Sequence, residues 1–150
     1  GGPGAAMPPM KSFGEFYRAT YLEEHKTQGC RRWHYLGTSL VLLFCLRHPA
    51  TAASGLVAGA VGSALQRPMR HASSGLVEFA AMVATFVALQ RFLLGSLYHG
   101  LAPLALGYGC AWAGHFWCEK NRPATFLYPV HSLRGDLQMF ADAARGRLGG

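Results

Sequence analysis

Residues 107–136 read GYGCAWAGHFWCEKNRPATFLYPVHSLRGD, and the character of the chain changes in the middle of this stretch. The first half is apolar and rich in glycine, whereas the second half carries charged side chains and prolines. His115 and Glu119 stand at the boundary, four residues apart, so on a helix both side chains would lie on one face. This spacing suits a pair of metal ligands. It also suits the solvated end of a membrane helix, with His115 packed between helices and Glu119 paired with Lys120 or Arg122.

The composition favours an integral membrane protein built from helices. Hydrophobic residues make up 51% of the 150 residues and charged residues only 14%, which is unusual for a soluble domain. Residues 92–118 contain no Asp, Glu, Lys or Arg, and this length is enough to cross a bilayer. We therefore predict an all-α fold, a polytopic membrane helix bundle with about four apolar segments. These segments are residues 35–46, 50–65, 76–97 and 101–118, and the first two are short enough for one or both to be half-spans or a re-entrant hairpin.

Two amphipathic helices flank the apolar segments in this prediction. The first covers residues 12–26 and starts with a capping box formed by Ser12 and Glu15. The second covers residues 132–148, and its expected apolar face consists of Leu133, Leu137, Phe140 and Ala144. Both helices are expected at the membrane surface. We expect residues 1–10 to be a disordered tail and residues 11–150 to form a single membrane-embedded helical domain.

The net charge of +7 indicates a membrane surface, and not nucleic acid, as the partner. The basic residues stand at the ends of apolar segments and form no stripe interleaved with aromatic residues, as a nucleic-acid-binding face would. A basic loop at Arg67 and Arg70, together with an even number of crossings, predicts that both termini are cytoplasmic. The cysteines form no C-x-x-C pair, so we expect them to be reduced packing residues. They are Cys30, Cys45, Cys110 and Cys118.

Three motifs are similar to those of one protein family. The first runs from Glu24 and His25, through a basic pair, to His34 and Gly37. The second joins A-W-A-G-H-F at residues 111–116 to E-K-N-R-P-A at residues 119–124, and the third is residues 128–136. These motifs resemble a family of small membrane proteins whose characterised fungal member is an iron(II)-dependent dioxygenase of 2-hydroxy fatty acids in the endoplasmic reticulum. The resemblance covers residues 13–38 and 107–148.

The resemblance implies a reaction and the residues that perform it. His25, His34 and His115 would bind Fe(II) and, with Glu119, would form the catalytic site. The substrates would be O₂ and a long-chain 2-hydroxy fatty acid whose tail lies in membrane lipid. Cleavage of the C1–C2 bond would give CO₂ and a fatty acid one carbon shorter, in the endoplasmic reticulum. The expected substrate contacts are Arg32, Asn121 and Arg122.

The chain has to bend to bring the two N-terminal histidines together. His25 and His34 are nine residues apart and would lie on opposite sides of one straight helix. We expect a break near Gly29, between the first amphipathic helix and the first apolar segment. Zinc could use the same ligand atoms as iron. His99, in the apolar part of the chain, is a further candidate ligand, as is Glu119.

Other functions fit parts of the same sequence. Each histidine alone is more often a packing or surface residue than a ligand, so a non-catalytic membrane protein that binds lipid or acts as a scaffold is the alternative function. A hydroxylase or desaturase is disfavoured. Such enzymes commonly carry H-x-x-H or H-x-x-x-H clusters, whereas no two of the seven histidines here are closer than nine residues.

Overall fold

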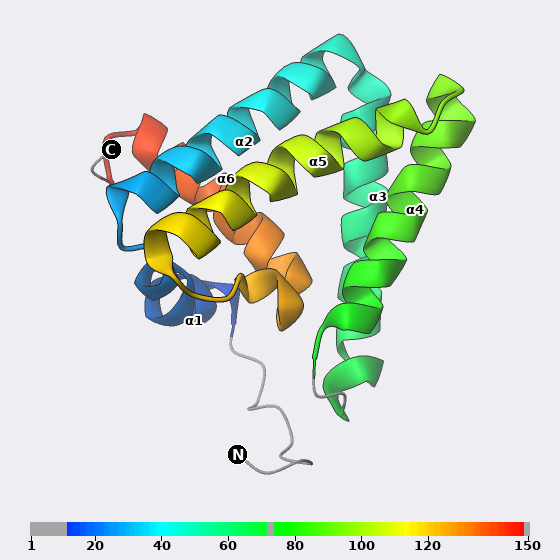
Figure 1. Ribbon diagram of the computed structural model, residues 1–150. Helices are drawn as coiled ribbons and strands as arrows, with labels where there is room; N and C mark the ends of the chain where they lie inside the picture. Colours follow the sequence, from blue (N-terminus) through cyan, green and yellow to red (C-terminus); the bar gives the residue numbers. More distant parts are fainter. Residues whose placement is uncertain (1–11, 72–73, 149–150) are drawn as a thin grey trace.

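The computed structural model describes residues 12–71 and 74–148, and within these ranges every regular element is helical (Figure 1). The α-helices are α1 Phe13–Phe16, α2 Gln28–Arg47, α3 Pro49–Gln66, α4 Leu76–Leu94, α5 Tyr98–Ala113 and α6 Pro129–Ala144. Short π and 3₁₀ turns lie between them: η1 Tyr17–Tyr21, η2 Leu22–Glu24, η3 Pro68–His71, η4 Gly114–Glu119 and η5 Ala124–Phe126. The predicted all-α class is confirmed, and the expected tail at residues 1–10 lies outside the described ranges.

The long helices form two antiparallel pairs that meet at a corner. α2 packs along α5, and α3 packs along α4 (Figure 1). Between α2 and α3 the chain bends by 118° at His48, because Pro49 excludes the helical conformation from the residue before it. Between α4 and α5 it turns at Gly95, whose φ of 81° a glycine adopts without strain. We call residues 42–57 and 92–101, which surround these two turns, the corner.

Among the described residues, fewer helices than the four expected segments are long and apolar enough to cross a membrane. Within the described part of the chain, α4 is the one helix that is long and apolar enough to cross a membrane by itself, and α2 with α3 passes only as a bent pair. By length and composition these residues therefore provide one crossing, or up to two, and a bundle of four separate spans is not confirmed. α5 has 16 residues and contains Pro103, so it is shorter than the roughly 20 residues that a crossing helix needs.

The N-terminal segment, residues 12–27, covers the start of α2. Its predicted capping box is present: the backbone nitrogen of Glu15 donates to Ser12 Oγ, and that of Ser12 donates to the Glu15 carboxylate. A regular helix does not continue to residue 26, since the segment widens into the π turn η1 and leaves helical structure after η2. A buried cluster of Phe16, Tyr17, Tyr21, Ala124 and Met139 joins this segment to α6.

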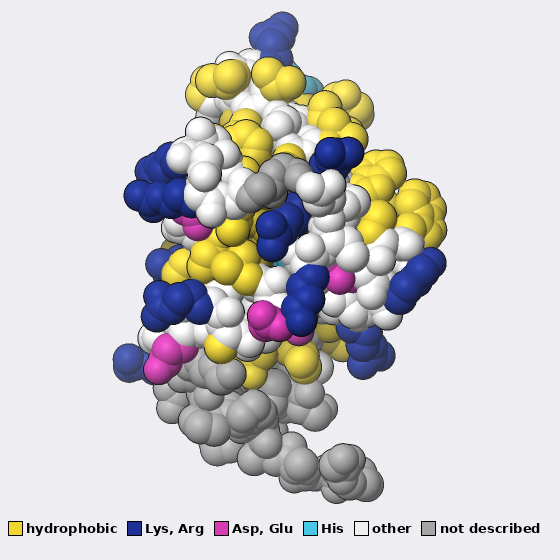
Figure 2. Space-filling view, turned by 90° about the vertical axis from the view of Figure 1, so that its left-hand side faces the viewer, with side chains coloured by type: hydrophobic (Ala, Val, Ile, Leu, Met, Phe, Trp, Pro, Cys, Tyr) yellow, Lys and Arg dark blue, Asp and Glu magenta, His cyan; other side chains and the backbone are white. Residues whose placement is uncertain are grey.

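α6 packs a face of small and polar residues against the rest of the protein and leaves two leucines of its expected apolar face exposed. Leu133 and Leu137 are exposed, and the face that Figure 2 shows mixes apolar side chains with many lysine and arginine side chains. The buried face carries small and polar residues instead, among them Val130, Ser132, Gly135, Met139 and Asp142. Gly135 is buried because the ring of Tyr21 lies so close that an added Cβ would come within 2.6 Å of it.

Candidate metal centre

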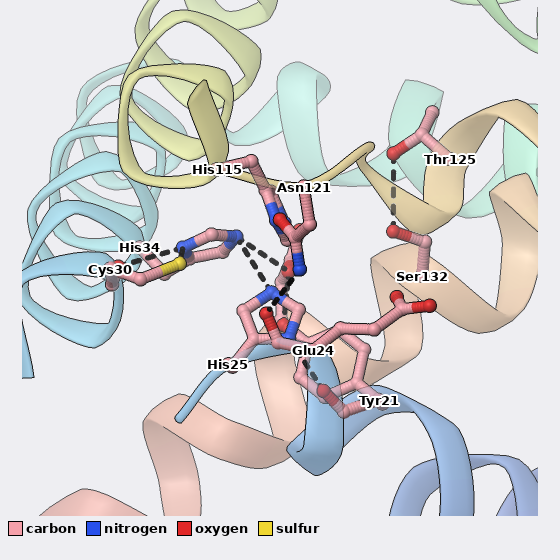
Figure 3. A network of polar contacts seen from close by, with 10 residues as sticks. Tyr21, Glu24, His25, Cys30, His34, His115, Asn121, Thr125 and Ser132 are labelled. Carbon is pink, nitrogen blue, oxygen red and sulfur yellow. Dashed lines mark hydrogen bonds and ion pairs between the residues drawn. The ribbon is translucent and has the colours of Figure 1, made fainter. Parts of the chain in front are cut away.

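Imidazoles from three separate segments meet beside the N-terminus of α2 (Figure 3). His25 lies in the turn after η2, His34 in the second turn of α2, and His115 in η4. All three are buried, and the Nε2 atoms of His25 and His34 are 3.1 Å apart. The ring centroid of His115 lies 4.5 Å from that of His25 and 5.0 Å from that of His34. The structure therefore brings together the three histidines named from the sequence, and we call them the histidine centre.

Each imidazole of the histidine centre is oriented by a hydrogen bond from Nδ1 to an oxygen atom. An oxygen acceptor fixes the proton on Nδ1 and leaves the lone pair of Nε2 free to bind a metal. Two nitrogen ligands at about 2.1 Å from one ion are about 3.0 Å apart when they are at right angles, close to the separation of the first two Nε2 atoms. The acceptors are the carbonyl oxygen of Tyr21 for His25 (2.6 Å), that of Cys30 for His34 (2.9 Å), and Oδ1 of Asn121 for His115 (2.7 Å).

The backbone of the N-terminal segment provides the acceptor for His25. In a continuing α-helix, the carbonyl of Tyr21 would accept from the backbone nitrogen of residue 25. Here the chain narrows to a 3₁₀ turn, and the backbone nitrogen of His25 donates to Leu22 at 3.2 Å. The carbonyl of Tyr21, at the start of this turn, accepts from Nδ1 of His25 at 2.6 Å. The ring of Tyr21 also stacks on that of His25, with a centroid distance of 4.0 Å.

A sharp turn after η4 brings Asn121 back to His115. Lys120 ends η4 with a φ of 58°, in the left-handed region, so the chain reverses and the backbone nitrogen of Asn121 donates to the carbonyl of His115 at 3.2 Å. Nδ2 of Asn121 donates to the carbonyl of Glu24 at 3.0 Å, which fixes which end of the amide faces His115. Asn121 was expected to contact the substrate. In the structure its amide orients a histidine.

Among the described residues, the side chains whose ligand atoms lie within 4.8 Å of one another are His25, Cys30, His34 and His115, and Glu119 lies outside this group. Its Oε1 accepts from the backbone nitrogen of Thr27 at 2.6 Å and from the Thr27 hydroxyl at 3.0 Å, so it caps the N-terminus of α2. η4 is wider than an α-helix, and a side chain four residues after His115 therefore no longer shares its face. Arg32 and Arg122 are exposed at the surface, and their contact with a substrate stays a prediction.

His99 is not a ligand of this centre. It lies at the corner, where its ring is 4.8 Å from that of His48 and its Nδ1 is 2.7 Å from the hydroxyl oxygen of Ser96. At a rise of 1.5 Å per helical residue, His99 and His115 are roughly 24 Å apart along the helix axis.

Two residues beside the imidazoles were not expected there: Cys30 was interpreted only as a packing residue, and Asp136 was given no role. Cys30 is buried, and its Sγ lies 3.6 Å from Nδ1 of His34, on the far side of that ring from Nε2 (Figure 3). Its sulfur therefore faces a nitrogen whose proton is already donated to a carbonyl. Asp136, on α6, has Oδ1 3.8 Å from Nε2 of His34 and accepts a hydrogen bond from the hydroxyl of Tyr21. The sequence feature that could have identified Asp136 is its position at the end of the third motif.

Burial keeps the imidazoles in the form that binds a metal. Desolvation, reinforced by the neighbouring His34 and His115, lowers the pKa of His25 to about 2. Burial also lowers the pKa of His115. Burial raises the pKa of Asp136 to about 6, against the opposing effects of the Tyr21 hydrogen bond and of His115. Neutral nitrogen donors beside a partly buried carboxylate fit a divalent cation, which supplies the positive charge that the site lacks.

The comparison with known proteins agrees with the three motifs. No curated protein and no solved structure matches the chain. A family model described as 2-hydroxy-palmitic acid dioxygenase Mpo1-like matches residues 10–148, nearly the whole chain. The chain therefore belongs to the Mpo1-like family.

Proposed function

We propose that this protein is an Fe(II)-dependent dioxygenase that cleaves the C1–C2 bond of long-chain 2-hydroxy fatty acids. The description of its family names a 2-hydroxy fatty acid as the compound oxidised. The observation that carries the proposal is the histidine centre, in which an oxygen atom accepts a hydrogen bond from each Nδ1, so that each Nε2 keeps its lone pair for a metal. Three nitrogen ligands leave further coordination positions open for substrates.

The chain's own residues bind and orient in this proposal. His25, His34 and His115 would hold Fe(II), which supplies the one-electron chemistry that O₂ requires. The overall reaction converts R–CH(OH)–COOH and O₂ into R–COOH, CO₂ and H₂O. C2 loses three electrons and C1 loses one, so the four electrons that O₂ accepts come from the substrate and no external reductant is needed. Burial of the imidazoles keeps bulk water from the reacting atoms.

The carboxylate of the substrate would be bound at the basic surface beside the histidine centre. Arg31 lies beside the histidine centre, and its Nε donates to the carbonyl of His25 at 2.7 Å. Arg32 follows Arg31 and Arg122 follows Asn121 in the sequence, and both side chains are exposed. They are proposed to pair with the substrate carboxylate, because guanidinium groups bind carboxylates through paired hydrogen bonds.

We also propose that the corner lies in the hydrocarbon region of the endoplasmic reticulum membrane, with both termini on the cytoplasmic side. Large apolar side chains are exposed there, Phe92 at 84% and Leu46 at 79%. The others are Leu42, Leu43, Leu56, Val57, Leu93, Leu97, Tyr98 and Leu101. The hydroxyl of Tyr17 donates to Asp142 at 2.9 Å, so the two ends of the described chain are adjacent, as a common side requires.

Metal analysis followed by O₂ uptake with 2-hydroxypalmitate tests the function. The purified protein should retain about one iron per chain and release about one CO₂ for each O₂ consumed. His115→Ala should lose both iron and activity, whereas His48→Ala, a histidine at the corner, should keep both. Full activity of His115→Ala would refute the proposal. A wild-type protein that binds lipid vesicles but neither iron nor substrate would support the non-catalytic alternative.

A further inference from the structure

α6 presents a carboxylate to the histidine centre. Oδ1 of Asp136 lies 3.8 Å from Nε2 of His34, and the same Nε2 lies 3.1 Å from Nε2 of His25. One nitrogen atom thus faces both an imidazole and a carboxylate. The carboxylate of Asp136 also interacts electrostatically with His115.

We propose that Asp136 binds the same metal ion as the three histidines, so that the centre has three imidazole ligands and one carboxylate ligand. This inference rests on the proposed function. Two ligand atoms at about 2.1 Å from one ion lie about 3.0 Å apart at right angles and about 4.2 Å apart when opposite. The separations of 3.1 Å and 3.8 Å around Nε2 of His34 fall within this range.

The charge balance of the site favours the same assignment. Within the described part of the chain, no lysine or arginine forms a salt bridge with Asp136. A carboxylate that is largely removed from water is costly unless a cation is near, and a divalent ion among the imidazoles would be that cation. The anionic ligand in turn lowers the net charge of the loaded centre from +2 to about +1.

Tyr21 holds both the carboxylate and one imidazole in place. Its hydroxyl donates to Oδ1 of Asp136, which has a second lone pair for a metal, while its ring and its carbonyl both contact His25. The ring itself is fixed against Gly135, the neighbour of Asp136. Outer contacts of this kind commonly orient metal ligands.

The same helix supplies a matched control. Asp142 is buried and, like Asp136, accepts a hydrogen bond from a tyrosine, here Tyr17 at 2.9 Å. Its other partners are Gln138 and Arg147, and it lies away from the imidazoles. Replacing Asp142 therefore removes an equivalent tyrosine–carboxylate pair without touching the histidine centre.

Titration of the apoprotein with Co(II) tests the assignment, because the visible spectrum of Co(II) reports its ligand set. Asp136→Asn should bind Co(II) at least about tenfold to a hundredfold more weakly and with a changed spectrum. Asp142→Asn should bind with wild-type affinity and spectrum. Tyr21→Phe should weaken binding without changing the spectrum, and Tyr17→Phe should leave both unchanged.

The outcomes separate this inference from the proposed function. A wild-type spectrum in folded Asp136→Asn, whatever its affinity, would overturn the ligand assignment and leave a centre of three histidines. Failure of the wild-type protein to bind Co(II) or iron would instead overturn the function. If Asp136→Asn does not fold, Asp136→Glu decides: the longer side chain should shift the Co(II) spectrum, and an identical spectrum would overturn the assignment.

Discussion

Asn121→Ala removes the side chain that ties His115 to the N-terminal segment. It deletes the 2.7 Å hydrogen bond from Nδ1 of His115 and the 3.0 Å bond to the carbonyl of Glu24. Without its acceptor, the imidazole is free to rotate and to move its proton to Nε2, where it would occupy the lone pair that a metal needs. We expect metal affinity to fall about 10- to 100-fold, which corresponds to about 1.4–2.7 kcal/mol.

Competition with a metal chelator under anaerobic conditions measures this loss. Asn121→Asp is the control, because its carboxylate still accepts from Nδ1 of His115 and should preserve most of the affinity. Loss of the donor to Glu24 should lower the free energy of unfolding of both variants by about 1 kcal/mol. If Asn121→Ala binds metal as the wild type does but has a raised KM for 2-hydroxypalmitate, Asn121 contacts the substrate and the reasoning is wrong.

Three more predictions concern the surroundings of the centre. Glu119→Ala removes the cap at Thr27 and should lower the free energy of unfolding in urea by about 0.5–2 kcal/mol with metal content unchanged; loss of metal would place Glu119 among the ligands. Gly135→Ala puts a Cβ 2.6 Å from the ring of Tyr21 and should cost about 1–3 kcal/mol and weaken metal binding. Unchanged thermal unfolding would show that the ring can move aside. In the apoprotein, the pKa of His25 is about 2 against an ordinary value of 6.5, so the unfolded state takes up the proton first. Stability should be complete above that ordinary value and fall below it by about 1.4 kcal/mol per pH unit for this imidazole, and urea unfolding that becomes harder on acidification would contradict this.

The sequence was sufficient to choose the three imidazoles, but not to place the break between the first two. A bend between His25 and His34 was required, and glycine made Gly29 the apparent position. In the structure Thr27 caps α2 with its own hydroxyl, which accepts from the backbone nitrogen of Cys30, so the helix starts before the glycine. Gly29 lies inside α2 for another reason, since a Cβ there would come within 2.8 Å of the sulfur of Cys118.

Hydrophobic periodicity could not predict the contacts of Asn121 and Asp136. Asn121 meets Glu24 across 97 positions of sequence, and Asp136 meets Tyr21 across 115. Hydrophobic spacing reports which face of one helix is apolar, whereas the partner of a polar side chain depends on how distant segments pack. The expected bundle of four spans is not confirmed, since within the described residues only α4 by itself, and α2 with α3 as a bent pair, are long and apolar enough to cross a membrane.

Departures from regular helix are concentrated where the imidazoles meet, and this follows from what an imidazole ligand requires. Each Nδ1 needs an oxygen acceptor, yet an α-helix uses its own carbonyls for backbone hydrogen bonds. His25 gains its acceptor at the start of the 3₁₀ turn η2, from the carbonyl of Tyr21, and His115 gains one where η4 widens and the chain turns back. His34 lies inside α2 and has to share the carbonyl of Cys30 with the backbone. Asp136 approaches this imidazole at its other ring nitrogen, with Oδ1 3.8 Å from Nε2, so α6 brings a carboxylate to the side of His34 on which a metal would bind.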